Sequence, residues 1–368
     1  MKIALDAYHA HRAYGGIARY LRGLVPALAA AARSDQFVLF SNRFRDRDAS
    51  WDPGLPNVSC YDLVCPRRLM QGCWDHLAWP PVESFIGPID LFHGAHFVLP
   101  AARRAKLVLT VHDLTYLRHP DYFSDRALNE RGYRVELPRA LARADAVIAD
   151  SSQTKADLVE LLGCPEERIM VVYPGVDTRF FVAADEARLA EVKARYHLER
   201  PYLVFLVGSP EPRKNLVRAV TAARQAAPDM PLVIVGPQEP IRTLLGGETQ
   251  GMILLGSLSD EDLPLVLHGA EAALYPSLYE GFGFPAVEAL AAGVPLITSN
   301  RSSLPEVVGK AALLVDPESV EAMAEAIHNL LRDAEQRKQY IALGLARARE
   351  LSWEETARQV LQLYHEVA

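Results

Sequence analysis

Short apolar runs alternate with helical patterns along almost the whole chain, and this alternation limits the possible folds more than any other feature. Segments with apolar residues at helical spacing include residues 17–32, 154–163, 216–227 and 320–334. The runs between such segments read as strands: KIALDAY, FVLFS, KLVLTVHD, AVIADS and IMVVYP, then YLVFLVG, PLVIVG, MILLGS, AALYPS and PLITSN. Strands alternating with helices form βαβ units, so the sequence predicts an α/β protein with parallel, doubly wound sheets.

The length of the chain predicts two domains. At 368 residues it exceeds one ordinary core and fits two domains of roughly 150 to 200 residues. The boundary falls in YPGVDTRFF, residues 173–181, where Pro174 and Gly175 end a strand pattern and a charged helical pattern follows. We therefore expect domains over residues 1–174 and 175–351. Ligands of such sheets bind beyond the carboxyl ends of the strands, so two facing sheets predict a deep cleft between the domains.

Composition and local patterns indicate a cytoplasmic protein. The longest apolar runs, such as LVFLV, fall well short of the roughly 20 residues that cross a bilayer. MKIALDAYHA reads as a first strand, because an aspartate stands where a secretory signal would have its apolar centre. The four cysteines form no paired CxxC framework and are expected to be reduced thiols.

Charge is distributed unevenly along the chain. Residues 1–175 carry 21 Lys and Arg against 20 Asp and Glu, whereas the remainder carries 18 against 26. One interpretation of the N-terminal arginines is that they form an ordinary solvated surface. The functional interpretation is that they bind the N-terminal domain to an anionic membrane face, together with Trp74 and Trp79 of RRLMQGCWDHLAWPP. No nucleic-acid motif accompanies the arginines, so we expect no nucleic-acid partner.

One strand-to-helix turn of the second half carries two adjacent cations. In VGSPEPRKNLVRAV, residues 207–220, a strand ends in a loop and Asn215 is a plausible cap for the helix that follows. Arg213 and Lys214 would then lie beside a helix N-terminus. A guanidinium fork with a point charge suits a diphosphate, although a solvated basic loop would explain the pair equally well if it stood alone.

A second turn, EGFGFPAVEALAAG, combines glycines, a helix start and two carboxylates. Pro285 suits the first helical position and Gly293 the exit, while Gly281 and Gly283 allow the backbone to approach a ligand. If Glu280 and Glu288 were both helical, they would lie about 12 Å apart along the axis, so we do not expect them to share a proton. They fit better as two separate acceptors, one for sugar hydroxyls and one for a ribose diol. That pattern is typical of a nucleoside diphosphate sugar.

The first half offers weaker candidates. Gly15 and Gly16 form a bare turn after the first strand, without the spacing of a dinucleotide fingerprint. His112 and Asp113 stand where the strand KLVLTVHD ends, on the ligand side of the predicted sheet. A lone histidine is as often structural as functional.

Together these elements resemble the retaining family 4 glycosyltransferases of the GT-B fold, and within them the bacterial O-antigen and polysaccharide mannosyltransferases. The combination of PRKN with the E-x7-E of EGFGFPAVE is specific, whereas no single motif is. The resemblance implies two facing Rossmann-like domains, the first binding the acceptor and the second the donor, with a last helix near 352–368 returning to the first. It covers nearly the full chain through AYGGIARYL, TVHDLTYLRHP, VIADSSQTKADL, VYPGVD, GSPEPRKNL, EGFGFPAVE, SSLPEVVGKAALLVDP and SWEETARQVLQLY.

The resemblance also implies roles for matching residues. Arg213 and Lys214 would hold the donor diphosphate, Glu288 the ribose hydroxyls, and Glu280 the donor sugar. His112 would lie against the sugar through its carbonyl or ring and complete the catalytic group. The remaining donor-binding positions would be the backbone or turns at Gly15, Gly16, Gly236, Gly256, Ser257, Leu258, Gly281, Phe282, Gly283 and Phe284.

The expected activity is transfer of a hexose, with mannose from GDP-mannose as the best guess, to a glycan or lipid-linked saccharide in bacterial surface polysaccharide synthesis. No metal and no cofactor is expected, because the diphosphate is already a good leaving group and cations can stabilise its charge. The alternatives are a UDP-, dTDP- or ADP-sugar donor, a non-catalytic nucleotide-sugar-binding subunit, and a phosphorylase or epimerase of the same architecture. The expected location is the cytoplasm, with peripheral contact on the inner membrane.

Overall fold

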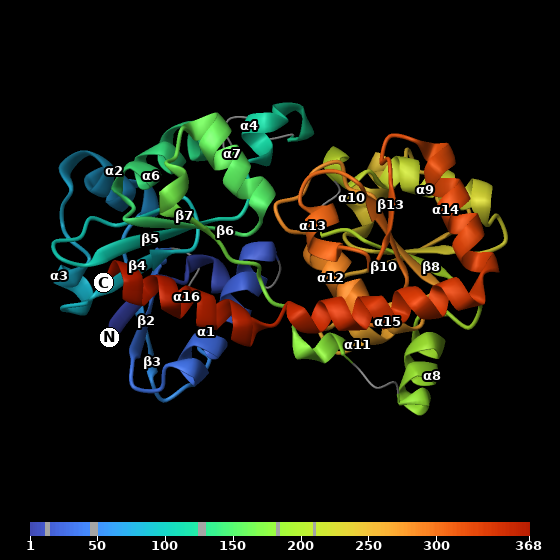
Figure 1. Ribbon diagram of the computed structural model, residues 1–368, viewed down its shortest axis with the longest axis horizontal. Helices are drawn as coiled ribbons and strands as arrows, with labels where there is room; N and C mark the ends of the chain where they lie inside the picture. Colours follow the sequence, from blue (N-terminus) through green and yellow to red (C-terminus); the bar gives the residue numbers. More distant parts are fainter. Residues whose placement is uncertain (12–14, 45–50, 124–129, 182–184, 209–210) are drawn as a thin grey trace. The chain divides into compact units, whose positions relative to one another are not determined.

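The chain forms two units, each with its own sheet. The computed structural model describes residues 1–11, 15–44, 51–123, 130–181, 185–208 and 211–368 (Figure 1). The first unit comprises Met1–Gly175 and Trp353–Ala368, and the second Val176–Ser352. These limits lie within one residue of the boundaries expected from the sequence. The cleft expected between the two domains stays a prediction.

The first unit is built on a seven-stranded parallel sheet of order β3-β2-β1-β4-β5-β6-β7. Its inner strands are almost wholly buried, as expected of a parallel sheet covered on both faces. The strands are β1 (Lys2–Asp6), β2 (Gln36–Asn42), β3 (Val58–Leu63), β4 (Leu91–Gly94), β5 (Lys106–Val111), β6 (Ala146–Ala149) and β7 (Ile169–Val171).

Helices cover both faces of this sheet. Side chains of α2, α6 and α7 join one apolar core with one face of the sheet, while α1 and α16 lie together on the other face (Figure 1). Ser151 caps α7 by accepting from the Thr154 N–H, and Gly163 ends it in the left-handed conformation. The helices are α1 (Gly16–Ala31), α2 (Arg67–Leu77), α3 (Glu83–Ile86), α4 (Thr115–Arg118), α6 (Leu137–Arg143), α7 (Ser152–Leu162) and α16 (Trp353–Val367).

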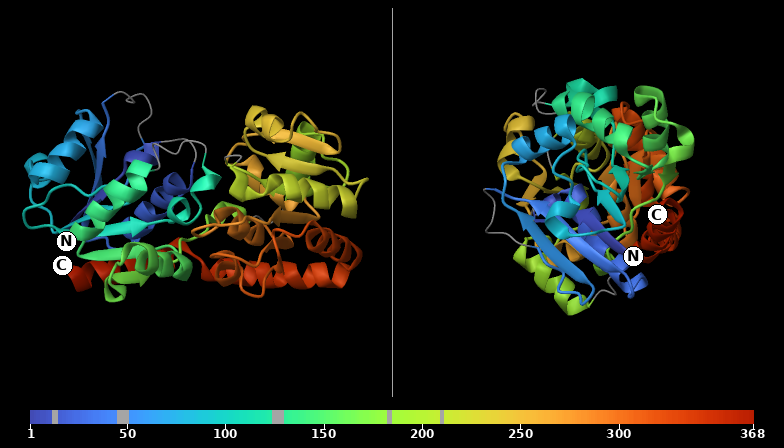
Figure 2. Two further views of the ribbon diagram at one scale, coloured as in Figure 1. Left: turned by 90° about the horizontal axis from the view of Figure 1, so that it is seen from above. Right: turned by 90° about the vertical axis from the view of Figure 1, so that its left-hand side faces the viewer.

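The C-terminal helix α16 is an integral part of the first unit, and both chain ends lie on this unit (Figure 2). Gly23 of α1 lies directly against the indole of Trp353; a Cβ at this position would come within 2.0 Å of the ring. The fully buried Tyr364 places its hydroxyl 2.6 Å from Nδ1 of His93 on β4. Close helix contact and a buried hydrogen bond thus hold α16 in place.

The second unit repeats the architecture with a six-stranded parallel sheet of order β10-β9-β8-β11-β12-β13. One face packs against α9, α10 and α14. The strands are β8 (Leu203–Leu206), β9 (Leu232–Val235), β10 (Met252–Gly256), β11 (Ala272–Tyr275), β12 (Leu296–Ser299) and β13 (Leu313–Val315). The helices are α8 (Glu186–Arg195), α9 (Leu216–Ala226), α10 (Gln238–Leu244), α11 (Asp262–His268), α12 (Phe284–Ala291), α13 (Leu304–Val308), α14 (Val320–Arg332) and α15 (Ala334–Glu350).

The strand order reverses direction at one place in each sheet. In the first unit this switch point lies between β1 and β4, and in the second between β8 and β11. Successive connections depart to opposite sides there, which leaves a crevice outside the carboxyl ends of the two strands where ligands of such sheets bind. Among the helices of the described ranges, none is both long and apolar enough to cross a bilayer.

Candidate functional site

The two loops that leave the switch point of the second unit are joined by hydrogen bonds. After β8 the chain reaches a short 3-10 turn at Pro212–Lys214, and Asn215 follows in the left-handed conformation with φ 62°. Asn215 is the N-cap residue of α9, as predicted, but its side chain makes no cap hydrogen bond. Its amide instead donates to the carbonyls of Pro276 (3.0 Å) and Pro317 (2.6 Å), so it fixes the loop after β8 against the loop after β11.

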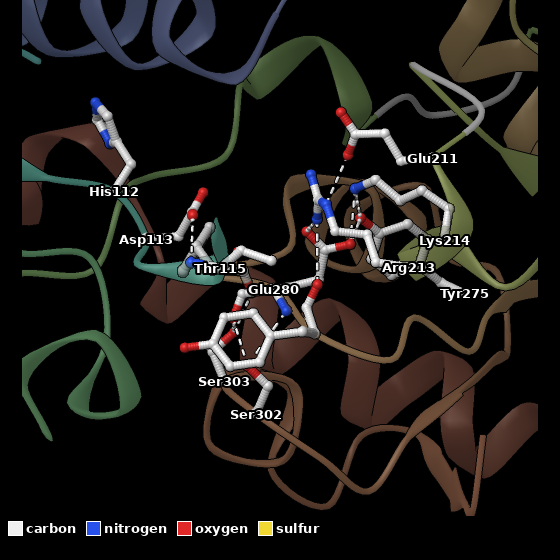
Figure 3. Close-up of polar contacts among 12 residues, drawn as sticks. His112, Asp113, Thr115, Glu211, Arg213, Lys214, Tyr275, Glu280, Ser302 and Ser303 are labelled. Carbon is white, nitrogen blue, oxygen red and sulfur yellow. Dashed lines mark hydrogen bonds and ion pairs between the residues drawn. The ribbon is translucent and has the colours of Figure 1, made fainter. Parts of the chain in front are cut away.

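This arrangement brings Glu280, from the loop after β11, onto the cation pair of the loop after β8 (Figure 3). Its Oε2 accepts from Nη1 of Arg213 at 2.7 Å, and its Oε1 accepts from Nζ of Lys214 at 2.7 Å. The hydroxyl of Tyr275 donates to the same Oε1 at 2.8 Å, while Nε of Arg213 donates to Glu211 at 2.6 Å. Both cations are therefore in direct contact with Glu280.

The cluster is buried, and its charges depend on one another. Burial favours the neutral form of Glu280, but Arg213 and Lys214 outweigh burial and lower its pKa to about 2. Burial lowers the pKa of Lys214, Arg213 lowers it further, and Glu280 opposes both effects. Glu280 is therefore ionised at neutral pH. With Glu211 included, two carboxylates balance two cations.

The backbone of Glu280 is held by two serines. Oγ of Ser302 accepts from the Glu280 N–H at 3.2 Å and donates to the Glu280 carbonyl at 2.6 Å (Figure 3). Oγ of Ser303 donates to the same carbonyl at 2.9 Å. Because this buried loop has no regular secondary structure, the two hydroxyls serve as hydrogen-bond partners for the Glu280 backbone. They thereby fix the position of the Glu280 carboxylate.

The glycine turn after Glu280 leads into α12. Gly283 has φ 98° at the N-cap, and a Cβ there would approach Leu304 to 2.7 Å, so both conformation and space require glycine. Pro285 lies in the first turn, and Gly293 follows the helix in the left-handed conformation. Glu288 lies within α12 and is 2% exposed. Of the other predicted donor contacts in this turn, Gly281 and Phe282 are buried and Phe284 is half-buried.

The remaining predicted donor positions of the second unit lie at the same edge of the sheet. Gly236 follows β9, and its N–H donates to the carbonyl of Gly256 at the end of β10 at 2.9 Å. A Cβ on Gly236 would lie 2.1 Å from the Val207 carbonyl, so the loop after β8 leaves no room for a side chain. Ser257 is exposed beside this turn and Leu258 is buried. The carboxyl ends of β8 to β11 thus carry every donor position predicted in this unit.

The first unit places His112 just after β5. Its Nε2 donates to the Ala95 carbonyl at 2.9 Å, and its Nδ1 lies 2.6 Å from Oδ2 of Asp150. Its own carbonyl accepts from Oγ1 of Thr154 at 3.3 Å. Burial disfavours the charged ring, but Asp150 outweighs burial and raises the pKa of His112. Both ring nitrogens of His112 face acceptor oxygens, and burial raises the pKa of its partner Asp150 as well. The contact of His112 with a sugar stays a prediction.

Gly15 and Gly16 begin α1, where Gly15 is the N-cap with φ 125° and both are exposed. The three residues before them lie outside the described ranges. Asp113, next to His112, accepts from the Thr115 N–H at 2.8 Å (Figure 3). It also accepts from the Tyr133 hydroxyl at 3.0 Å. Within the described ranges no three His, Cys, Asp or Glu side chains gather in a way that could hold a metal ion.

Sequence reasoning missed the residues that position the others. All four contact residues distant in the chain: Tyr275 accepts from Lys214, Asp150 pairs with His112, and Ser302 and Ser303 hold Glu280. Tyr275 and Asp150 each stand at or just after the carboxyl end of a buried strand, which was the available signal. Ser302 and Ser303 precede the helix α13 and read from sequence only as a helix start.

Comparison with known proteins identifies the relatives of both units. Residues 14–180 match the family described as Glycosyltransferase Family 4, and residues 190–345 match Glycosyl transferases group 1. The O-antigen chain mannosyltransferase B of Escherichia coli is 30% identical, over 95% of this chain and 95% of its own length.

Two solved structures share the fold over the whole chain. Sucrose-phosphate synthase from Thermosynechococcus elongatus superposes with a TM-score of 0.81 at 24% identity, covering 100% of this chain and 98% of that one. Anabaena HepE in complex with UDP-glucose superposes with a TM-score of 0.75 at 19% identity, covering 100% of both chains.

Proposed function

Since this chain belongs to the family 4 glycosyltransferases of the GT-B fold and resembles their bacterial mannosyltransferases, we propose that it transfers mannose from GDP-mannose. The acceptor is a glycan or lipid-linked saccharide of surface polysaccharide synthesis. The name of the Escherichia coli relative supports both the sugar and the acceptor class. UDP-, dTDP- and ADP-sugars are the competing donors. The complex of HepE with UDP-glucose is the observation that favours a UDP-sugar among them.

The observation that carries the proposal is the buried cluster of Arg213, Lys214 and Glu280 at the switch point between β8 and β11. A guanidinium and an ammonium side by side suit the paired charges of a diphosphate. The N-terminus of α12, which follows the same loop, adds partial positive charge at the carboxyl edge. Glu288 on α12 is the residue we assign to the ribose hydroxyls.

The proposed chemistry uses the diphosphate as the leaving group and needs neither a metal nor a cofactor. The bond from the anomeric carbon to the phosphate oxygen breaks, and Arg213 and Lys214 stabilise the charge that develops there. The acceptor oxygen attacks from the same face, which retains the anomeric configuration, and its proton passes to the departing phosphate oxygen. Glu280 holds the two cations in place and supplies negative charge near the sugar.

A thermal-shift panel of GDP, UDP, ADP and dTDP tests the donor assignment. A ligand that binds only the folded chain raises its stability by RT ln(1 + [L]/Kd), so the preferred nucleotide gives the largest shift. We expect GDP to stabilise the wild type most and Lys214→Ala to lose the effect. Lys310→Ala, an exposed lysine of the same unit, is the matched control and should respond like the wild type. A preference for UDP would exclude GDP-mannose as the donor.

Two further candidates are separated by turnover. A non-catalytic subunit would give the nucleotide shift without consuming any donor sugar. A phosphorylase would run in reverse with inorganic phosphate. The intact set of Arg213, Lys214, Glu280 and Glu288 favours transfer over both.

We also propose peripheral contact with an anionic membrane through the end of α2. Leu77 is 68% exposed and Trp79 63% exposed, with the exposed Arg68 on the same helix. Trp74 was expected on this surface and is not part of it. Its side chain is 4% exposed, and its Nε1 donates to the Pro80 carbonyl at 2.9 Å.

A further inference from the structure

A small polar pocket lies at the switch point of the first unit, away from every residue assigned above. Its walls come from the end of β1, the end of β2, helix α2, and β4 with the loop that follows. The free volume is about 20 Å³, enough for one water or one hydroxyl-bearing carbon group. The lining residues are Asp6, Tyr8, Phe40, Asn42, Arg67, Gln71, Trp74, Phe92, Val98 and Pro100.

The position of this pocket distinguishes it from the larger cavity of the second unit. That cavity, of about 370 Å³, is formed by segments around residues 197–200, 228–231 and 251–253. These segments precede or begin β8, β9 and β10, so the cavity lies at the amino edge of the sheet. Ligands of doubly wound sheets bind at the opposite, carboxyl edge, where the small pocket of the first unit lies.

Three buried polar side chains line the pocket: Asn42, which is 8% exposed, Asp6 and Gln71. Asp6 is 8% exposed, and its Oδ1 accepts from the Tyr8 N–H at 3.1 Å. Burial raises the pKa of Asp6, and the nearby Arg67 opposes that shift. Gln71 is 4% exposed, and its Oε1 has no hydrogen-bond partner among the residues that the structure describes. A buried acceptor without a donor costs about 1 to 3 kcal/mol, which a ligand that supplies the donor would recover.

The orientation of the Gln71 side-chain amide is fixed by residues on the side away from the pocket. Its Nε2 donates to Oδ1 of Asp75 at 2.7 Å, and a carboxylate can only accept, so the amide oxygen must be the other atom. Asp75 is in turn held by Arg139 at 3.6 Å and Arg143 at 3.5 Å. A chain of contacts therefore holds the unsatisfied oxygen of Gln71 in one place. It runs from the two arginines through the carboxylate of Asp75 to the side-chain amide of Gln71.

The remaining walls are aromatic and cationic. Trp74 uses its N–H on the Pro80 carbonyl, so only its ring faces the pocket, together with the rings of Phe40 and Phe92. The guanidinium of Arg67 stacks over the Tyr8 ring at 4.2 Å and faces the charge of Asp6. The pocket therefore offers hydrogen-bond acceptors, the guanidinium of Arg67 as a donor, and apolar surface.

We propose that this pocket binds a hydroxyl or hydroxymethyl group of a neutral saccharide acceptor, which extends the proposed transferase function to its second substrate. A hydroxyl donates to Gln71 Oε1 or Asp6 and accepts from Arg67, while the adjoining C–H groups contact the aromatic rings. The unsatisfied Oε1 of Gln71 can only accept a hydrogen bond, which favours a hydroxyl over a phosphate or a sugar acid. The volume admits one substituent of the sugar and leaves the ring outside, so the pocket selects the acceptor at one carbon.

Saturation-transfer NMR on the full chain tests this assignment, with the methyl α-glycosides of mannose, glucose and galactose as probes. At least one glycoside should bind the wild type, and Gln71→Leu should weaken that binding at least fivefold. Val98→Leu narrows the pocket without removing a polar contact and should also weaken glycoside binding. This second variant keeps the test valid if Gln71→Leu destabilises the fold. Leu69→Gln, on the exposed side of the same helix, is the matched control and should bind normally.

Three results would overturn the pocket assignment: no glycoside binding to the wild type, unchanged binding in Val98→Leu, or Arg67-dependent competition by inorganic phosphate. Failure of the transferase proposal can be distinguished from failure of the pocket proposal. If the protein binds a glycoside in this pocket but no nucleoside diphosphate stabilises it, the transferase proposal is contradicted and the pocket proposal stands. A chain with a normal nucleotide response and no glycoside binding contradicts the pocket alone.

Discussion

At the scale of single residues, Glu280 links the two loops of the candidate donor site. Its side chain bridges Arg213 and Lys214, and its backbone is held by Ser302 and Ser303. A buried carboxylate with this many donors is stabilised in its charged form. Glu280 also opposes the effect of burial and of Arg213, which lower the pKa of Lys214.

The lowered pKa of Glu280 predicts a pH-dependent part of the stability. Because its folded-state pKa of about 2 lies below the ordinary value of 4.5, the unfolded chain binds more protons between these pH values. The contribution is therefore complete above about pH 4.5 and is lost as the pH falls towards 2. Urea unfolding of the wild type and Glu280→Gln at pH 3 to 7 should show a stability difference that shrinks on acidification. A constant difference would contradict the assigned charge.

Glu211 gives a second prediction at this scale. Its carboxylate holds Nε of Arg213 at 2.6 Å and competes with any diphosphate for that guanidinium. Glu211→Gln should therefore tighten nucleoside diphosphate binding by about twofold to tenfold, in line with a partly exposed charge pair of up to 1 kcal/mol or slightly more. Isothermal titration with GDP measures this effect. Weaker binding in Glu211→Gln would mean that Glu211 contacts the ligand in another way.

The sequence singled out Arg213, Lys214 and Glu280 but not the contacts that join them. Arg213 and Glu280 are 67 residues apart, and nothing in either motif says that their loops meet. The strand order brings them together, because β8 and β11 are neighbours in the sheet. For the same reason Tyr275 and Asp150 could be recognised only once the strand ends were placed.

At the scale of elements, α2 separates two tryptophans that looked equivalent in the sequence. Met70, Gln71 and Trp74 recur at helical spacing and form its buried face, whereas Trp79 follows the helix end and is exposed. The expectation that both would meet a membrane failed because the helical period assigns one to the core.

The exposed end of α2 predicts binding to anionic vesicles. The double variant Leu77→Ser, Trp79→Ser should reduce co-sedimentation with phosphatidylglycerol vesicles several-fold, because it removes the apolar side chains that would enter the interface. Leu343→Ser, an exposed leucine of the second unit, is the control and should bind as the wild type does. Equal binding to neutral phosphatidylcholine vesicles, or no loss in the double variant, would contradict the membrane proposal.

The contact between α1 and α16 gives a prediction about stability. Gly23→Ala should destabilise the fold by about 1 to 3 kcal/mol, because the new methyl group meets the Trp353 ring. Chemical unfolding measures the loss, and adding Trp353→Leu should restore part of it. Gly72→Ala on α2 is the control, since no atom lies within 4 Å of its new methyl group. A Gly23→Ala protein as stable as the wild type would show that α16 packs more loosely than described.

The strands that sequence analysis missed lack the signal of a buried apolar run. β3 and β13 are partly exposed edge strands, and in β4 the apolar residues are followed by His93 and Gly94. An apolar run is a reliable signal only for a strand that is buried on both faces. All ten runs that were predicted as strands contain strands of the two sheets.

At the scale of the whole molecule, the two units share one strand order. Local numbering within each unit gives 3-2-1-4-5-6 in both sheets, with a seventh strand added to the first. The alternation of runs and helices predicted parallel sheets but could not give this order, because order depends on which faces the helices cover. The candidate donor cluster and the proposed acceptor pocket each lie at the switch point of their own sheet.

The most direct test of the proposed function is release of nucleoside diphosphate from GDP-mannose in the presence of a saccharide acceptor. The wild type should release GDP with each transfer, and Lys214→Ala and Glu280→Ala should each be at least tenfold slower while remaining folded by circular dichroism. Lys310→Ala should match the wild type. Full turnover in both Lys214→Ala and Glu280→Ala would contradict the assignment of the buried cluster as the donor site.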